Sequence, residues 1–125
     1  MKRIYIAGPM RGTFNLNRPV FEEVAAAFRN EGFVVESPIE IGARFGTDQE
    51  LLNDKDLLLK LMNFEEETIR TCDAIALLPD WEKSRGARQE LLVALREQLQ
   101  IIPIKWTNAN TVWVVDEPSQ SEVKP

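Results

Sequence analysis

Short apolar runs alternate with amphipathic segments along most of the chain. The apolar runs are rich in β-branched and aromatic residues, and most of them end at glycine, proline or a charged residue, which is the pattern of strands. Five runs predict strands: RIYIAG at 3–8, FVVESP at 33–38, DAIALLP at 73–79, IIPIKW at 101–106 and TVWVV at 111–115. The run at 73–79 is apolar throughout, which indicates a strand covered on both faces.

Three segments between these runs have helical periodicity. In 18–32 an inward face of Val20, Val24, Ala27 and Phe28 is followed by a glycine stop. The TDQE sequence at 47–50 has the form of a capping box. The leucine-rich segment after it is expected to be helical to about residue 71, with an interruption around 53–54.

The third helix is expected to begin at Ser84, where Ala87, Leu91, Ala94 and Leu95 recur at helical spacing on an inward-facing stripe. Residues 39–46, IEIGARFG, contain two glycines and no clear periodicity, so they predict a loop.

Strands that alternate with helices predict an α/β fold. We expect a three-layer sandwich with a flavodoxin- or Rossmann-like, mostly parallel sheet of about five strands. Residues 1–115 are expected to form a single domain, and the polar residues 116–125 a disordered tail. Sites in such sheets lie at the carboxyl ends of the strands. Two segments meet that rule, GPMRG at 8–12 and PDWEKSRG at 79–86.

Composition narrows the classes of partner. The 125 residues are 44% hydrophobic and 28% charged, which is ordinary for one globular domain. A net charge of −5 argues against nucleic acid polymers and anionic membranes as partners, although a small phosphorylated ligand remains possible. The sequence contains no run long enough to span a membrane and no signal-peptide core, so we expect a cytoplasmic protein.

The chain has no histidine and one cysteine, Cys72. An internal disulfide, the usual zinc sites and all histidine-based triads are therefore excluded. No dinucleotide fingerprint or P-loop is present. We expect no cofactor and no metal, so acid, base or nucleophile chemistry must fall to carboxylates, tyrosine, serine, lysine or Cys72.

Glu90 is the residue that the helical pattern does not explain. It lies beside Leu91 and Ala94 on the inward stripe, where a carboxylate must be paired, neutralised or directed into a cleft. Ser84 is a plausible N-cap, and Gly86 would let a ligand approach the first N–H groups, where the helix dipole favours an anion. Ordinary capping would also explain Ser84 and Gly86, but it does not explain Glu90.

Other candidates have two interpretations each. GPMRG, with Gly8, Met10, Arg11 and Gly12, could hold a ligand with backbone N–H groups and a guanidinium, or it could be a tight connection with an exposed arginine. Trp81 could stack on a planar base or pack within its loop. The acidic run at 65–67 is typical of a solvated face, with at most one side chain directed inward.

IYIAGPMRG and CDAIALLPDWEKSRGARQE resemble the nucleoside 2-deoxyribosyltransferase-like superfamily, especially a phage-rich branch of uncharacterised members, over roughly residues 4–105. The resemblance implies a flavodoxin-like fold and a glutamate nucleophile. The motif of the 2'-deoxynucleoside 5'-phosphate N-hydrolases in this superfamily, Ser-x-Gly-x-x-x-Glu, is matched by Ser84, Gly86 and Glu90. Transferases that act on free nucleosides typically carry Asp where Ser84 stands, and Asp would repel a phosphate.

The N-terminal motif of those hydrolases, Tyr-x-x-Gly-x-x-Arg-Gly, is matched by Tyr5, Gly8, Arg11 and Gly12. The resemblance implies that Tyr5 orients the glutamate and that Arg11 contacts the nucleotide. The second carboxylate of the family is an Asp that aligns with Glu65, which is one methylene longer.

The resulting hypothesis is an N-glycosidase of nucleotide metabolism that hydrolyses the base–sugar bond of 2'-deoxynucleoside 5'-monophosphates. A deoxyribosyltransferase and a non-catalytic nucleotide-binding protein remain alternatives. The excess of leucine between 51 and 62 further predicts a homodimer or a higher homo-oligomer.

Overall fold

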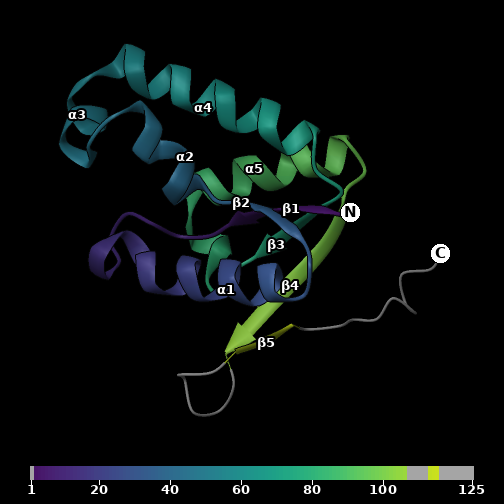
Figure 1. Ribbon diagram of the computed structural model, residues 1–125. Coiled ribbons are helices and arrows are strands. Elements are labelled where there is room, and N and C mark those ends of the chain that lie inside the picture. Colours follow the sequence, from purple (N-terminus) through teal and green to yellow (C-terminus); the bar gives the residue numbers. More distant parts are fainter. Residues whose placement is uncertain (1, 107–112, 116–125) are drawn as a thin grey trace.

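Five strands form one sheet in the order β2-β1-β3-β4-β5 (Figure 1). The computed structural model describes residues 2–106 and 113–115, so the expectation of a disordered tail at 116–125 lies outside the described residues. The strands are β1 (Arg3–Ala7), β2 (Val34–Glu36), β3 (Ala74–Leu77), β4 (Gln100–Trp106) and β5 (Trp113–Val115). The first four are parallel and β5 is antiparallel to β4, which confirms the mostly parallel α/β sheet.

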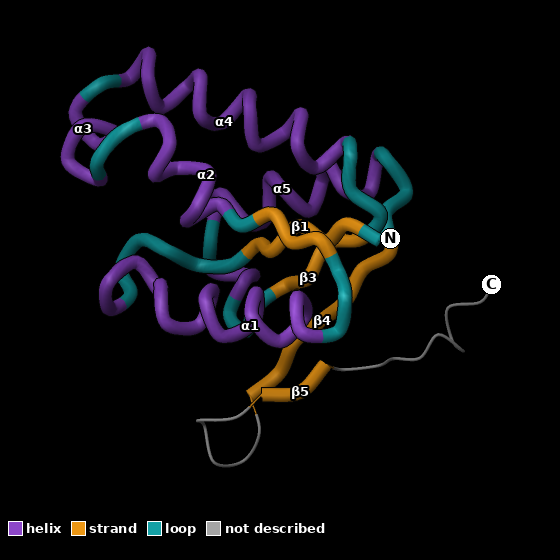
Figure 2. Tube along the Cα trace, viewed as in Figure 1, coloured by secondary structure: helices purple, strands orange, loops and turns teal. Residues whose placement is uncertain are grey.

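Helices cover both faces of this sheet (Figure 2). The helices are η1 (Phe14–Asn17), α1 (Arg18–Asn30), α2 (Pro38–Phe45), α3 (Asp48–Asn53), α4 (Lys55–Arg70), η2 (Trp81–Lys83) and α5 (Arg85–Arg96), of which η1 and η2 are short 3-10 turns. Helix α1 packs on one face, and α2, α4 and α5 contribute to the core on the other. The three-layer sandwich is therefore confirmed.

Strand alternation decides which side chain reaches which layer. Successive residues of a strand point to opposite faces, so Ile4 and Ile6 join the core under α1, while Tyr5 and Ala7 join the core under α4 and α5. Tyr5 is 0% exposed, although its hydroxyl needs a hydrogen-bond partner. The alternation of side chains along β1 therefore places the buried hydroxyl of Tyr5 on the side of the sheet that α4 and α5 cover.

The inward faces of two helices differ in part from those that the spacing predicts. In α1 the buried residues include Phe21 and Ala25, whereas Ala27 is exposed. In α5, Val93 is buried and Leu95 is 52% exposed. The stabilisation that an apolar side chain contributes depends on the apolar area that it buries. A phenylalanine ring buries more area than the methyl group of Ala27, so Phe21 faces the core instead.

The expectation of a loop at 39–46 is wrong, because this segment forms α2. The Ser37 hydroxyl caps the helix by accepting a hydrogen bond from the Ile39 N–H at 3.3 Å, and Pro38 occupies the first turn, where a missing N–H costs nothing. Pro38, Ile39, Ile41 and Gly42 are buried, and a Cβ built on Gly42 would be in ordinary van der Waals contact with Leu51 and Leu61 at 3.9 Å. Tertiary packing overrides the low helix propensity of glycine here.

The expected break in the leucine-rich segment is present. Thr47 and Glu50 form the predicted capping box at the start of α3. Asp54 separates α3 from α4 in an extended conformation, and its carboxylate caps α4 by accepting a hydrogen bond from the Leu57 N–H at 3.0 Å. Among the helices that the structure describes, none combines the length and apolarity needed to cross a bilayer.

Candidate active site

The side chains of Tyr5 and Glu90 meet between the sheet and α5. The Tyr5 hydroxyl donates a hydrogen bond of 2.7 Å to Glu90 Oε2. Tyr5 comes from the central part of β1 and Glu90 from the second turn of α5, so residues 85 positions apart in the chain are joined here. The partly buried carboxylate on the inward stripe is thus explained by a buried phenol and an adjoining pocket.

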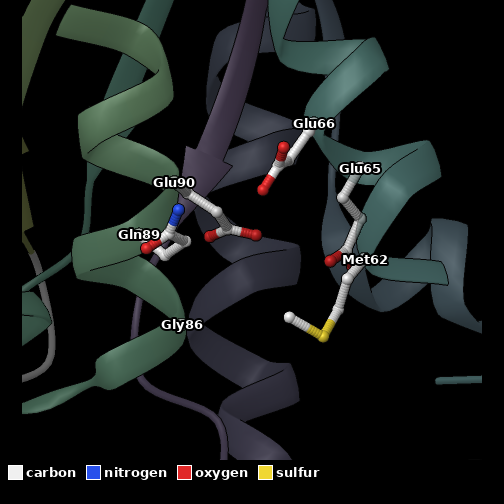
Figure 3. A pocket seen from close by; sticks show the side chains of 6 residues that line it. All are labelled: Met62, Glu65, Glu66, Gly86, Gln89 and Glu90. Atoms are coloured by element: carbon white, nitrogen blue, oxygen red, sulfur yellow. The ribbon is translucent and has the colours of Figure 1, made fainter. Parts of the chain in front are cut away.

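The side chain of Glu90 lines a small hollow between α4 and α5 (Figure 3). Its volume is about 50 Å³, and its lining residues are Met62, Glu65, Glu66, Gly86, Gln89 and Glu90. Glu65 and Glu66 reach it from α4, and the carboxyl groups of Glu66 and Glu90 point toward each other across it. The expectation that at most one residue of the acidic run 65–67 points inward is therefore wrong.

The register of α4 explains the difference. Residues three and four apart share one helix face, so both Glu65 and Glu66 follow Met62 toward the hollow. Glu67 is directed away, and its carboxylate accepts a hydrogen bond from Arg70 at 3.1 Å. Two of the three glutamates consequently face the hollow and one faces solvent.

Burial shifts the pKa values of this group strongly. Removal from water raises the pKa of Glu65 to about 7 and that of Glu90 well above its ordinary value. The negative charge of Glu65 raises the pKa of Glu90 further, while the hydrogen bond from Tyr5 opposes the rise. Burial, followed by the charge of Glu90, also raises the pKa of Tyr5, so Tyr5 remains a neutral donor at physiological pH.

Glu65 and Glu90 are therefore two carboxyl groups with raised pKa values that face one hollow. A pair of this kind could serve as an acid and a nucleophile if one group keeps its proton while the other is ionised. Such pairs are used where one group must donate a proton and the other must attack or stabilise a cation.

The N-terminus of α5 forms one rim of the same hollow. Ser84 is the N-cap, as predicted, and its Oγ accepts a hydrogen bond from the Ala87 N–H at 3.1 Å. The hydroxyl proton of Ser84 remains able to donate to a ligand. Gly86 is exposed, and a Cβ built on it would meet nothing within 4 Å. The first turn of α5 is therefore open to an anionic group.

Several other candidates lie away from the hollow. Gly8 is needed for packing, because a Cβ there would stand 2.7 Å from the Cβ and Cδ1 of Leu78. Met10 packs against the core under α1, and Trp81 packs against the core on the α5 side. Arg11 and Gly12 are exposed and do not line the hollow, although Gly12 adopts the left-handed conformation (φ +81°) that the turn requires.

Sequence reasoning missed Met62, Glu66 and Gln89 as lining residues. Gln89 precedes Glu90 and follows Gly86 by three positions, so helical spacing could have placed it on the same rim. Within residues 2–106 and 113–115, no group of three or more Cys, Asp or Glu residues is arranged to hold a metal ion.

Comparisons with known proteins agree with this fold. The family model "Domain of unknown function (DUF4406)" matches residues 2–103. No curated protein gives a significant sequence match. The solved structure of a 2-desoxiribosyltransferase from Leishmania mexicana is 23% identical and superposes with a TM-score of 0.55. The match covers 82% of this chain and 63% of that one, so the two proteins have a fold in common and this chain spans under two thirds of that enzyme's length.

Proposed function

We propose that this chain, which belongs to the DUF4406 family, hydrolyses the base–sugar bond of 2'-deoxynucleoside 5'-monophosphates. The observation that carries the proposal is the hydrogen bond of 2.7 Å from the buried Tyr5 to Glu90, within a hollow that Glu65 also lines. The fold shared with a 2-desoxiribosyltransferase supports glycosyl transfer as the class of reaction.

Glu90 acts as the nucleophile. Its ionised carboxylate attacks C1' as the C1'–N bond breaks, and the bonding electron pair leaves with the base, which takes a proton from Glu65. The product is a glycosyl ester on Glu90. Water then attacks C1', the ester bond breaks, the proton of the water returns to Glu65, and deoxyribose 5-phosphate is released with retained configuration.

Tyr5 is a positioning residue in this scheme. Its hydroxyl holds one oxygen of Glu90 and favours the ionised state, since the hydrogen bond lowers the pKa of Glu90 against the effect of burial. The other oxygen of Glu90 is left to reach C1'.

The 5'-phosphate would lie at the N-terminus of α5. Ser84 and the N–H of Gly86 would donate to it, and the dipole of the twelve-residue helix favours its charge. Arg11 is exposed in the loop that follows β1 and would supply a guanidinium, while Met10, Gly12 and Trp81 would shape the surrounding loops. Binding energy from the phosphate would then position C1' over Glu90.

A second copy of the chain would complete the pocket. The hollow of about 50 Å³ is far smaller than the roughly 300 Å³ and more that enclose a small ligand. Met62 on its rim is 43% exposed, and the exposed apolar residues Leu59 on α4 and Leu92 on α5 extend the apolar surface. Light scattering at micromolar concentration should therefore give at least twice the mass of 14.3 kDa.

Deoxyribosyl transfer is the second candidate, since a second base could capture the glycosyl ester in place of water. The fold shared with a transferase favours it, and Ser84 at the phosphate position favours the hydrolase. Product analysis with and without a free acceptor base separates the two, because only the transferase forms a new nucleotide. Tight binding of intact nucleotide without release of base would instead indicate a sequestering protein.

The decisive experiment compares the wild type with Glu90→Gln. The amide is nearly isosteric but cannot form the ester, so base release should fall by about a thousandfold or more while the fold is retained. Release within about tenfold of the wild-type rate would overturn the assignment of Glu90. Glu67→Gln on the solvent side of α4 is the matched control and should leave the rate unchanged.

A further inference from the structure

Glu66 is a third carboxylate in a hollow where hydrolysis needs two. It lines the hollow with Glu65 and Glu90, and its side chain points toward Glu90 (Figure 3). Over residues 2–106 and 113–115 no hydrogen bond or ion pair compensates it, in contrast to Glu67, which pairs with Arg70. Glu66 is partly buried, and its carboxylate is available to accept a hydrogen bond from a ligand that enters the hollow.

The remaining wall indicates the chemistry of that ligand. No lysine or arginine is among the lining residues, which offer carboxyl oxygens, the amide of Gln89 and the thioether of Met62. Such a wall has many acceptors and few donors. A planar group could lie against Met62, and its edge would need to bring N–H donors or a positive charge to Glu66.

Within the proposed nucleotide hydrolysis, on which this inference rests, we propose that Glu66 selects bases that carry an amino group beside a protonatable ring nitrogen. Cytosine and adenine have such an edge. A carboxylate accepts from an exocyclic amino group, as acidic side chains do from the N4 amino group of cytosine. Uracil and hypoxanthine instead present a carbonyl oxygen at the same position, and two acceptors facing each other repel.

The same charge assists the departure of an amino-bearing base. Glu65 donates its proton to the ring nitrogen, so the base becomes a cation while it is still attached to C1'. Glu66 stabilises that cation as a counter-ion. The C1'–N bond then breaks, its electron pair returns to the ring, and the neutral base leaves as Glu90 forms the ester. An oxo base has no amino group to carry part of the positive charge toward Glu66, so its protonated form gains less from this counter-ion.

The test uses two pairs of deoxynucleoside 5'-monophosphates that differ only in an amino or an oxo group, dCMP with dUMP and dAMP with dIMP. We expect kcat/KM to favour the amino member by about tenfold or more in the wild type. Glu66→Gln keeps the shape of the side chain and removes its charge, so the preference should fall below about threefold. Glu67→Gln, on the adjacent solvent-facing position, should keep the wild-type preference.

Equal rates for the two members of each pair, or a preference for the oxo member, would overturn the inference while the proposed hydrolysis stands. An equal loss of preference in Glu66→Gln and Glu67→Gln would also overturn it. If none of the four nucleotides is cleaved, the hydrolysis proposal fails by itself. Equilibrium binding of the same four nucleotides to the wild-type protein then decides the base preference, and equal dissociation constants within each pair would refute it.

Discussion

Replacement of Glu65 by glutamine should make the folded protein more stable at neutral and alkaline pH. Glu65 lies in the α4–α5 hollow, and burial raises its pKa from 4.5 to about 7. The folded protein therefore keeps the Glu65 proton over a range in which the unfolded chain releases it. Glutamine resembles the protonated acid and has no charge to desolvate.

The sign and size of the effect follow from proton linkage. Because the folded pKa is the higher one, the stability linked to Glu65 is fully present below pH 4.5 and is lost as the pH rises through about 7. A shift from 4.5 to about 7 corresponds to roughly 3 kcal/mol at pH 8 and to about 1 kcal/mol at pH 5. Solvent around this partly exposed group screens the effect, so the gain of Glu65→Gln over wild type should grow by about 1–2 kcal/mol between pH 5 and pH 8.

Urea unfolding at pH 5, 6, 7 and 8, followed by tryptophan fluorescence, measures this difference directly. The control is Glu67→Gln, whose side chain is 74% exposed and pairs with Arg70, and it should show no comparable trend with pH. A difference between Glu65→Gln and wild type that stays constant from pH 5 to pH 8 would refute the reasoning. The same trend in Glu67→Gln would assign the effect to the net charge of α4 instead of the hollow.

Three further substitutions test the hydrogen bond to Glu90 and the packing of two glycines. Tyr5→Phe removes the hydrogen-bond donor to Glu90 and should lower kcat by about tenfold or more. The pKa of Glu90 then rises, so the acidic limb of the kcat–pH profile should move to higher pH. An unshifted limb would contradict the positioning role of Tyr5. Gly8→Ala places a Cβ within 2.7 Å of Leu78 and should lower the free energy of unfolding, measured in urea, by about 1–3 kcal/mol. The methyl group of Gly86→Ala meets open space in a helix, so this change should raise the free energy of unfolding by up to about 1 kcal/mol. Equal effects of the two substitutions would contradict the tight packing of Gly8.

The order of strands and helices could be predicted from the sequence because it depends on local signals. Apolar runs that end at glycine or proline gave the strands, and the capping box at 47–50 gave the start of α3. Ser84 as the N-cap of α5 follows from its preference for accepting a hydrogen bond from the first turn. The helix at 38–45 was missed because burial of its inward face, and not local propensity, stabilises it; the buried residues are Pro38, Ile39, Ile41 and Gly42.

For the candidate site, the sequence identified Glu90 as a carboxylate on an apolar stripe, and the resemblance to a known superfamily linked it with Tyr5 and Glu65. Only the tertiary structure decided that Glu66, Met62 and Gln89 belong to the same hollow. It also showed that Gly8 is tightly packed against Leu78 and that Met10 packs against the core under α1. Local sequence determines which residues share a helix face, but which face of α4 meets which face of α5 depends on the area buried by the whole sheet and its helices.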